Sequence, residues 1–262
     1  METVTSADGT TIAFDQLGSG SPLVLVAGAS CDRAVDTAIA EALAEQFTVL
    51  NYDRRGRGDS TDTPPYAVER EIEDLEVLLA AAGGTAALVG LSSGAALSAH
   101  ATASGLTVSD LVMWEPPFRL DVEGQRQTKD YNEQLTGLLA DGRRGDALAL
   151  FMGMVGLPPE VIAGMRQSPY WSTGEAMAPT LAYDAAVMGD GSVPADTFTR
   201  ITAPTTVLAG GASPEWFRGS AQAAAAAIPG ARYDVLDGQT HDVEPAVLAA
   251  GVRDFVAPRL RA

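Results

Sequence analysis

Short apolar runs recur along the chain and are separated by stretches with other periodicities. Residues 23–26 contain no polar position, which is typical of a strand buried on both faces of a parallel sheet. Residues 4–14 instead alternate between polar and apolar positions around Asp8 and Gly9, and this pattern predicts a β-hairpin with a tight turn. The later apolar runs predict strands at residues 47–52, 86–89, 111–114, 205–209 and 233–236.

Amphipathic stretches lie between these runs and predict helices. The first of them has Val35, Ile39 and Leu43 at helical spacing. In residues 68–79 an apolar stripe is opposed by glutamates, among them Glu71, and we expect this acidic face to be solvated. Further helices are expected at residues 95–103, 221–228 and 246–256. Because strands and helices alternate, the predicted fold class is α/β with a parallel sheet.

Residues 117–199 have a different pattern from the rest of the chain. They are rich in methionine and glycine, they contain short amphipathic pieces at 131–139 and 146–154, and they show no convincing strand. We therefore expect a helical cap at residues 117–199 that is inserted into a core domain formed by residues 1–116 and 200–262.

The charge balance is strongly acidic, with 34 Asp and Glu against 17 Lys and Arg and a formal net charge of −17. Nucleic acids and anionic membranes bind basic surfaces, so neither is expected as a partner. No apolar stretch is long enough to cross a bilayer and no secretory signal is visible, so we expect a cytoplasmic protein. One cysteine, Cys31, and two histidines leave little for a metal site, and none is expected. The oligomeric state stays open.

A Gly-x-Ser-x-Gly motif occupies residues 90–94. It follows a predicted strand and precedes a predicted helix, which is the setting of a nucleophile elbow. Ser92 is therefore the candidate nucleophile, and glycines flank it because a sharp strand-to-helix turn leaves no room for side chains. The alternative is a glycine-rich turn with a buried serine.

A serine hydroxyl needs a base, and the usual base is a histidine brought near from elsewhere in the chain. His241 is the candidate, because it lies between the last predicted strand and the last predicted helix, at the carboxyl edge of the sheet. His100 lies inside the helix that follows Ser92, and we expect it to have a structural role.

These features occur in the order of a known family. The segment Asp-Arg-Arg-Gly-Arg-Gly-Asp-Ser at residues 53–60, the elbow at 90–94, the inserted cap and the late His241 together resemble the α/β-hydrolase fold family across essentially the whole chain. The resemblance implies an eight-stranded, mostly parallel sheet with helices on both faces and an inserted helical cap. It also implies a Ser-His-acid triad and no cofactor.

The third member of the triad departs from the commonest family pattern. Members usually carry an aspartate after the strand expected at 205–209, and Ser213 stands at that position here. Some branches, including certain haloalkane dehalogenases and the fungal zearalenone lactonases, place the acid after the strand next to the nucleophile strand, where this chain has Glu115. Glu115 is therefore the expected acid, with Asp53 and Asp59 as weaker rivals. Its alternative role is that of a strand-end carboxylate paired with an arginine.

The loop after the first buried strand is the second departure. Family members often have a His-Gly pair there, whereas residues 27–29 are Ala-Gly-Ala. The similar lactonases also lack the His-Gly pair. An oxyanion hole needs backbone N–H groups and does not need that ring. The N–H groups of Ala29 and Ser93 are therefore the expected oxyanion donors.

The predicted cap is expected to shape a pocket for a small, hydrophobic ester or lactone. Trp171 and Met154 are its candidate substrate-binding residues, and ordinary core packing is the alternative role for both. The other large apolar residues of this region are Phe151, Met152, Met165, Tyr170, Met177 and Met188.

Taken together, the residues predict a cofactor-free serine hydrolase that cleaves a neutral carboxylic ester or lactone through an acyl-enzyme on Ser92. The elbow carries no aspartate nucleophile, which disfavours the epoxide hydrolase and dehalogenase chemistry of this family. Two alternatives remain open. One is a carbon–carbon bond hydrolase or perhydrolase with the same triad, and the other is a non-catalytic ligand-binding or tailoring protein.

Overall fold

Eight strands form one mostly parallel sheet in the computed structural model, which describes residues 1–169 and 171–256. Their order is β1-β2-β4-β3-β5-β6-β7-β8, and only the pairings of β2 with β1 and with β4 are antiparallel. The predicted α/β fold with an eight-stranded sheet is confirmed. The strands are β1 (Glu2–Thr5), β2 (Thr11–Leu17), β3 (Ser21–Val26), β4 (Phe47–Tyr52), β5 (Ala86–Leu91), β6 (Val108–Trp114), β7 (Thr205–Gly210) and β8 (Arg232–Leu236).

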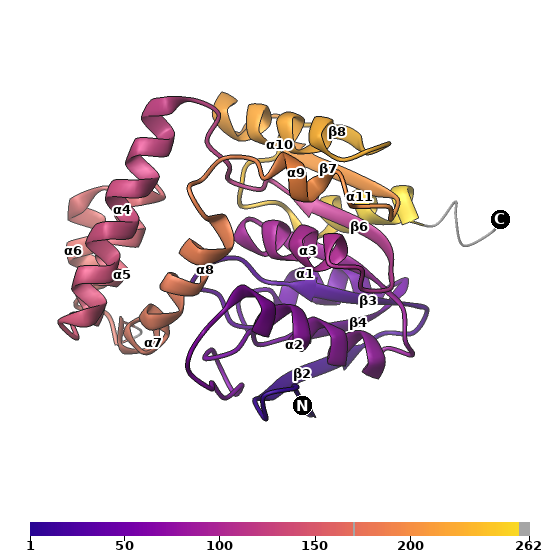
Figure 1. Cartoon of the computed structure of the whole chain (residues 1–262), viewed down its shortest axis with the longest axis horizontal. Coiled ribbons are helices and arrows are strands. Elements are labelled where there is room, and N and C mark those ends of the chain that lie inside the picture. The colour runs from indigo at the N-terminus through magenta and orange to yellow at the C-terminus, as the bar shows by residue number, and fades with distance from the viewer. Residues whose placement is uncertain (170, 257–262) are drawn as a thin grey trace.

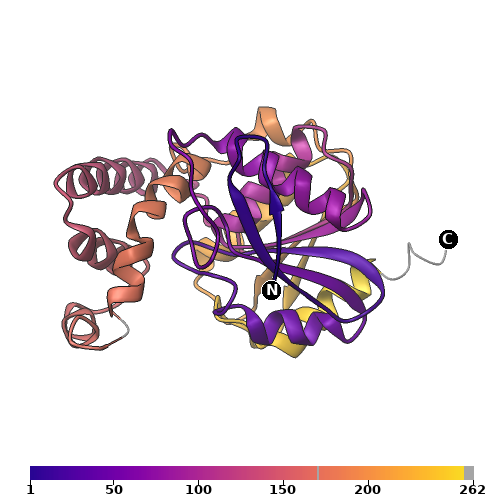
Figure 2. The ribbon, with the colours of Figure 1, turned by 90° about the horizontal axis from the view of Figure 1, so that it is seen from below.

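Helices cover both faces of the sheet (Figures 1 and 2). On one face lie α2 (Val68–Ala81), α3 (Ser93–Ala103) and α10 (Glu215–Ala227). On the other face lie α1 (Thr37–Ala44) and α11 (Pro245–Val256). The sheet is therefore the middle of three layers, as expected for an α/β protein with a parallel sheet.

Strand β3 shows why the sheet appears in the sequence as unbroken apolar runs. Val24 and Val26 pack in the hydrophobic cluster that contains α2, α3 and α10. Leu23 and Leu25 point the other way and pack with α1 and α11. All four side chains are fully buried. Each such burial stabilises the fold by roughly 2 kcal/mol, so none of these four positions favours a polar residue.

Two sequence expectations about helices are wrong. Val35 lies before α1 and is 61% exposed, because the Asp32 side chain accepts hydrogen bonds from the backbone N–H groups of residues 34 and 35 and forms a turn there. Glu71 on α2 is buried, although the acidic face of this helix was expected to be solvated. Its carboxylate forms a buried ion pair with Arg54 at 2.7 Å.

A run of helices is inserted between β6 and β7, and Figure 1 shows the first part of this run at the left of the molecule. We call α4 to α9 the inserted helices. Tyr131, Leu135 and Leu181 belong to a separate hydrophobic cluster within them, and Ala29 of the core packs against that cluster. The inserted helices are α4 (Val122–Ala140), α5 (Arg144–Met154), α6 (Pro159–Met165), α7 (Trp171–Met177), α8 (Leu181–Met188) and α9 (Ala195–Phe198), with a short 3₁₀ turn at Ala178–Thr180.

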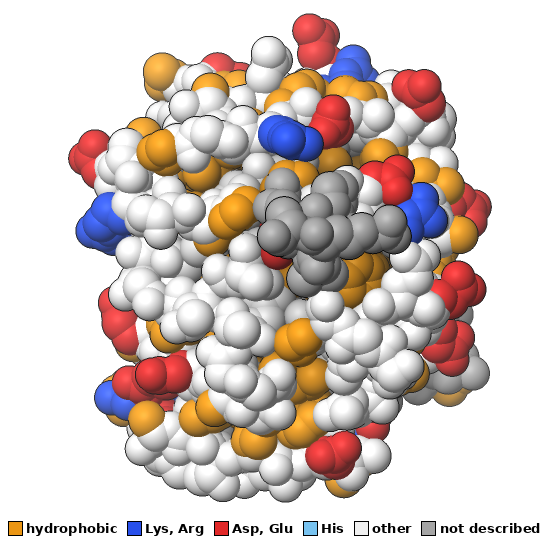
Figure 3. All heavy atoms as spheres, turned by 90° about the vertical axis from the view of Figure 1, so that its right-hand side faces the viewer, with side chains coloured by type: hydrophobic (Ala, Val, Ile, Leu, Met, Phe, Trp, Pro, Cys, Tyr) orange, Lys and Arg blue, Asp and Glu red, His pale blue; other side chains and the backbone are white. Residues whose placement is uncertain are grey.

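Charged side chains are spread over the surface of the sheet domain. On the face in Figure 3, acidic side chains are scattered around the rim among fewer basic ones, in keeping with the net charge of −17. Among the helices that the structure describes, none is long and apolar enough to span a membrane.

Asp36, which precedes α1, is buried at a cost in stability. Its Oδ2 has no hydrogen-bond partner among the described residues. Burial raises the pKa of this carboxyl group to about 6, and the negative charge of Asp32 adds to the rise. The folded state therefore binds a proton more readily than the unfolded chain, so this group makes the protein less stable as the pH rises from about 4 to about 6.

The Asp36→Asn variant is therefore expected to be more stable than the wild type above pH 6. The expected gain at pH 7 to 8 is about 2–3 kcal/mol, since each pKa unit is worth about 1.4 kcal/mol. It should vanish near pH 4, where the aspartate is already protonated in the folded state. Urea unfolding of both proteins at pH 4 and pH 7.5 measures the difference, and an equal gain at both values would contradict the titration argument.

Candidate active site

Ser92 occupies a strained turn between β5 and α3. Its φ is 53° and its ψ is −122°, a region that side chains with a Cβ rarely adopt. Gly94 follows at a point where the chain passes close to β3, and a Cβ there would collide with the carbonyl oxygens of Val26 and Ala27. The glycine thus allows the elbow to pack against the sheet while Ser92 stands at its carboxyl edge.

Backbone strain is concentrated around this edge. In the described residues the non-glycine positions with positive φ are Ser30 at 58°, Ser92 at 53° and Glu115 at 41°. These residues follow β3, β5 and β6, which are neighbours in the sheet. Strained residues persist where the surrounding structure holds them, and they cluster at functional sites. The strain therefore marks the same edge that the sequence motifs indicate.

Glu115 and His241 are joined by a hydrogen bond. His241 Nδ1 lies 2.7 Å from Glu115 Oε2, and the glutamate side chain is fully buried while the imidazole is 40% exposed. The other carboxylate oxygen, Oε1, accepts a hydrogen bond from the backbone N–H of Gly210 at 2.8 Å. The backbone N–H of Glu115 donates to Leu208 at 3.0 Å. The end of β7 therefore holds the glutamate in one orientation.

These contacts determine the protonation of the pair. Burial raises the pKa of the glutamate carboxyl group, but contacts from His241, Ser213 and Gly210 outweigh burial and hold it below its ordinary value. Ser213 Oγ is buried and has no hydrogen-bond partner in the described part of the chain. We therefore ascribe its effect on the pKa of Glu115 to the dipole of its hydroxyl group. An ionised carboxylate only accepts hydrogen bonds, so Nδ1 of His241 carries the proton. In the neutral ring, Nε2 is then free to accept one.

Trp114 connects the elbow to the histidine loop. Its carbonyl oxygen accepts a hydrogen bond from the backbone N–H of Ser92 at 2.9 Å. Its indole Nε1–H donates to the carbonyl oxygen of His241 at 3.0 Å. The side chain is buried, so one residue at the end of β6 fixes both loops. The described residues contain no hydrogen bond between the Ser92 hydroxyl and the His241 ring, and their partnership is part of the proposal below.

The expected oxyanion donors lie beside Ser92. A Cβ placed on Gly28 would lie 3.2 Å from Ser92 Cβ, so the loop that carries Ala29 passes directly against the elbow. Ser93 is the first residue of α3. The N-terminus of a helix carries unpaired N–H groups and a partial positive charge, and both favour an anion. Both expected donors are therefore close to Ser92, and their role as an oxyanion hole is part of the proposal below.

An aromatic stack next to His241 was not predicted from the sequence. Phe217 lies parallel to the imidazole, with ring centroids 4.4 Å apart. Trp216 stacks on Phe217 at 3.7 Å, and the guanidinium of Arg119 lies 3.9 Å from the centre of the Trp216 ring. The stack buries one face of the imidazole and restricts its rotation. The only sequence signal for this stack is the position of the two aromatic residues at the start of the helix that follows β7.

The other titratable candidates are occupied elsewhere. Asp53 and Asp59 both form ion pairs with Arg33, so neither is directed to the histidine. The Nε2–H of His100 donates a hydrogen bond to the carbonyl oxygen of Val187, and the ring packs edge-on against Phe198, in agreement with a structural role. No group of three or more His, Cys, Asp or Glu in the described ranges could hold a metal ion.

The two expected substrate-binding residues lie in different places. Met154 lines a cavity of about 530 Å³ between α4 and α5, together with Arg119 and Tyr131. Trp171 packs against the hydrophobic cluster of the inserted helices, and Tyr170 lies outside the described residues. Neither Ser92 nor His241 lines this cavity, so its part in substrate binding is a proposal.

Comparison with known proteins agrees with the fold. Residues 23–253 match the profile of the alpha/beta hydrolase family. An alpha/beta hydrolase from Sphaerobacter thermophilus is 52% identical, with a TM-score of 0.87 over 97% of this chain and 99% of that chain. A hydrolase from Pseudomonas aeruginosa is 26% identical, with a TM-score of 0.77 over 97% of each chain.

A thermophilic esterase from Thermogutta terrifontis, solved with malate bound, shares the fold at 24% identity and a TM-score of 0.68 over 99% of this chain and 97% of that chain. The family match and the 52% identical hydrolase support hydrolase activity in general. The chain belongs to the alpha/beta hydrolase family.

Proposed function

We propose that this protein is a cofactor-free serine hydrolase that cleaves a neutral carboxylic ester or lactone with a triad of Ser92, His241 and Glu115. The observation that carries the proposal is the 2.7 Å hydrogen bond between the buried Glu115 carboxylate and His241. It supports an imidazole whose Nε2 can take a proton from a serine on the strained elbow.

In this mechanism Ser92 Oγ attacks the substrate carbonyl carbon while His241 Nε2 accepts the hydroxyl proton. The N–H groups of Ala29 and Ser93 hold the negative oxygen of the tetrahedral intermediate. The intermediate then expels the alcohol, which receives the proton from His241, and leaves an acyl-enzyme on Ser92. Water then attacks the acyl carbon while His241 Nε2 takes its proton. The bond to Ser92 Oγ breaks, the proton passes from His241 to Ser92, and the acid product leaves.

The proposed position of the acid also bears on the substrate. An acid after β6 is the arrangement of the zearalenone-type lactonases that the sequence resembles, so lactones belong among the substrates to be tested. We further propose that the inserted helices act as a cap over the site, with the cavity lined by Met154 receiving the apolar part of the substrate. Carbon–carbon bond hydrolysis and perhydrolysis use the same triad and remain alternatives.

Labelling with a fluorophosphonate tests the proposal, because only an activated serine reacts quickly. We expect the native protein to be labelled within minutes, and mass spectrometry should find the adduct on the peptide that contains Ser92. Heat-unfolded protein is the control and should stay unlabelled. The same preparation is assayed with p-nitrophenyl esters of short and long acids and with macrocyclic lactones. A native protein that is neither labelled nor active on this panel would instead favour the non-catalytic alternative.

A further inference from the structure

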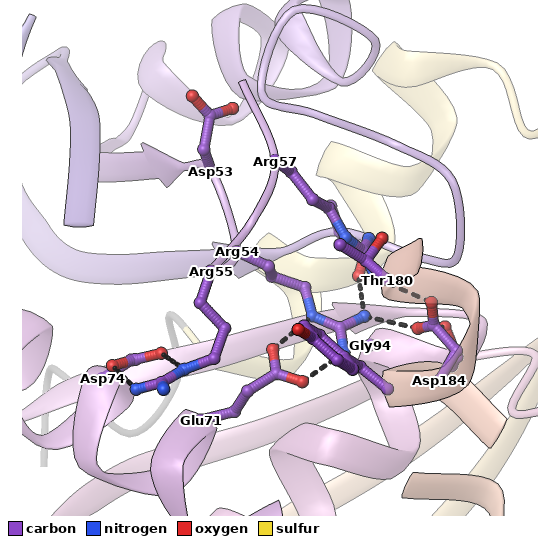
Figure 4. A network of polar contacts seen from close by, with 12 residues as sticks. Asp53, Arg54, Arg55, Arg57, Glu71, Asp74, Gly94, Thr180 and Asp184 are labelled. Atoms are coloured by element: carbon purple, nitrogen blue, oxygen red, sulfur yellow. Dashed lines mark hydrogen bonds and ion pairs between the residues drawn. The ribbon is translucent and has the colours of Figure 1, made fainter. Parts of the chain in front are cut away.

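We propose that Asp184, supplied by the inserted helix α8, is a positioning residue that aims both oxyanion N–H groups at the substrate carbonyl. The inference rests on the proposed function, in which Ala29 and Ser93 supply those groups. Asp184 touches no reacting atom. It acts on the first donor through Arg57 and on the second through the side chain of Ser93, and Figure 4 shows the network in which it lies.

Arg57 fixes the peptide unit that carries the first donor. Its Nη1 donates to the carbonyl oxygen of Gly28 at 2.6 Å and to that of Cys31 at 3.1 Å. Because the peptide bond is planar and trans, the N–H of Ala29 points opposite to the C=O of Gly28. Holding this carbonyl therefore sets the direction of the Ala29 N–H. The Arg57 side chain is only 1% exposed, so water does not compete for these hydrogen bonds.

Asp184 holds the arginine and the elbow with one carboxylate. Its Oδ2 pairs with Arg57 Nη2 at 2.7 Å. Its Oδ1 accepts a hydrogen bond from Ser93 Oγ at 2.8 Å and pairs with Arg54 Nη1 at 2.6 Å. The same Nη1 of Arg54 donates to the carbonyl oxygen of Ala27 at 3.3 Å. The carboxylate thus ties the loop of the first oxyanion donor to the residue that provides the second.

The charges of this network are balanced in the protein interior. Arg54 and Arg57 face the carboxylates of Asp184 and Glu71, and all four side chains are buried. Burial raises the pKa of Asp184, but the two guanidinium groups and the Ser93 hydroxyl hold it below its ordinary value. The carboxylate is therefore ionised at neutral pH, as the two ion pairs require.

A loss of this charge would affect the reaction in two opposite ways. Neutralising Asp184 leaves a surplus positive charge near the oxyanion, and this charge alone would stabilise the intermediate and raise kcat. Releasing Arg57 and Ser93 would misalign the two donors and lower kcat. The direction of the change in kcat therefore separates a positioning role from a purely electrostatic one.

We expect Asp184→Asn to lower kcat for a p-nitrophenyl ester by about 100-fold, the size of effect that follows the loss of one oxyanion donor. KM should change by less than about three-fold, because the donors act on the transition state more than on the bound ester. The affinity for a trifluoromethyl ketone, which adds to the serine as an oxyanion, should fall in parallel with kcat. A merely structural role would not link these two measurements.

Asp74→Asn is the matched control. Asp74 forms an equally buried ion pair with Arg55, with side chains 1% and 0% exposed and a distance of 2.7 Å. The other contacts of Arg55 are with Asp8 and the carbonyl oxygen of Arg70, away from the oxyanion loop. This variant should lose stability in thermal unfolding, as Asp184→Asn does, while kcat stays within about two-fold of the wild type.

Ser93→Ala keeps the test decisive if Asp184→Asn does not fold. Alanine retains the N–H donor and removes only the hydroxyl that Asp184 holds, and we expect kcat to fall by about five-fold. The inference is overturned if folded variants at both positions keep kcat within two-fold of an active wild type, or if Asp184→Asn raises kcat. An inactive and unlabelled wild type would instead remove the proposed function and the inference with it.

Discussion

Replacing Ser92 with alanine is expected to lower kcat for ester hydrolysis by about four to six orders of magnitude, since the proposed mechanism has no second group that could form the acyl-enzyme. Alanine keeps the Cβ, so the strained backbone with φ of 53° stays as it is. The free energy of unfolding should therefore change little. Steady-state kinetics with a p-nitrophenyl ester, together with circular dichroism and thermal unfolding, measure both expectations.

The matched control for this variant is Ser104→Ala at the opposite end of α3. Ser104 is exposed and bonds only to a backbone carbonyl of its own helix. It should keep the wild-type kcat. If Ser92→Ala retains more than a residual rate with an unchanged circular dichroism spectrum, a covalent intermediate on Ser92 is ruled out.

Glu115→Gln is expected to lower kcat by about 10³ to 10⁴-fold, by analogy with the loss of the acid in a serine-protease triad. The reason lies in the two contacts of the carboxylate. Because the N–H of Gly210 donates to one oxygen, the amide oxygen of glutamine takes that place and its NH₂ group faces His241. The imidazole must then accept at Nδ1 and carry its proton on Nε2. In that tautomer it cannot accept the proton of Ser92.

Two substitutions at Ser213 provide a control for the Glu115→Gln variant and a test for the recovery of its activity. Ser213→Ala should be nearly silent, because its hydroxyl only modulates the neighbouring glutamate. Adding Ser213→Asp to Glu115→Gln should recover part of the rate by placing a carboxylate at the usual family position. The values of kcat/KM for the single and double variants decide the matter. A rate of Glu115→Gln within a few-fold of wild type would show that Glu115 is not the acid.

The centre of the sheet could be predicted because strands β3 to β7 are buried on both faces. Such strands appear in the sequence as short runs of apolar residues. Strand β4, for example, has the bounds expected from the apolar run at 47–52. Ser92, Glu115 and His241 could be named in the same way, since each follows a predicted strand. The structure joins two of them by a hydrogen bond, while their catalytic roles stay predictions.

The partners of buried charges could not be predicted in this way. An amphipathic helical pattern predicts that every charged side chain faces the solvent. The prediction fails where a segment distant in the sequence places an opposite charge against that side chain. Glu71 is buried because Arg54 reaches it from another loop, and Asp184 is buried because two arginines of the core meet it. Phe217 was missed because its contact with His241 joins the start of α10 to a loop that is distant in the sequence.

The buried position of Asp184 limits how this enzyme scaffold could be redesigned. Substrate scope is often altered by grafting a foreign segment in place of the one that covers the active site. In this protein a graft in place of the inserted helices would remove Asp184, which pairs with Arg57 and is one of the two carboxylate partners of Arg54. It would leave an uncompensated buried charge, which destabilises a protein by about 3–5 kcal/mol. A transplanted segment must therefore supply its own aspartate at the place of α8. Under the proposal that the cavity between α4 and α5 receives the substrate, mutagenesis confined to these two helices would change specificity and keep the ion pairs of Asp184.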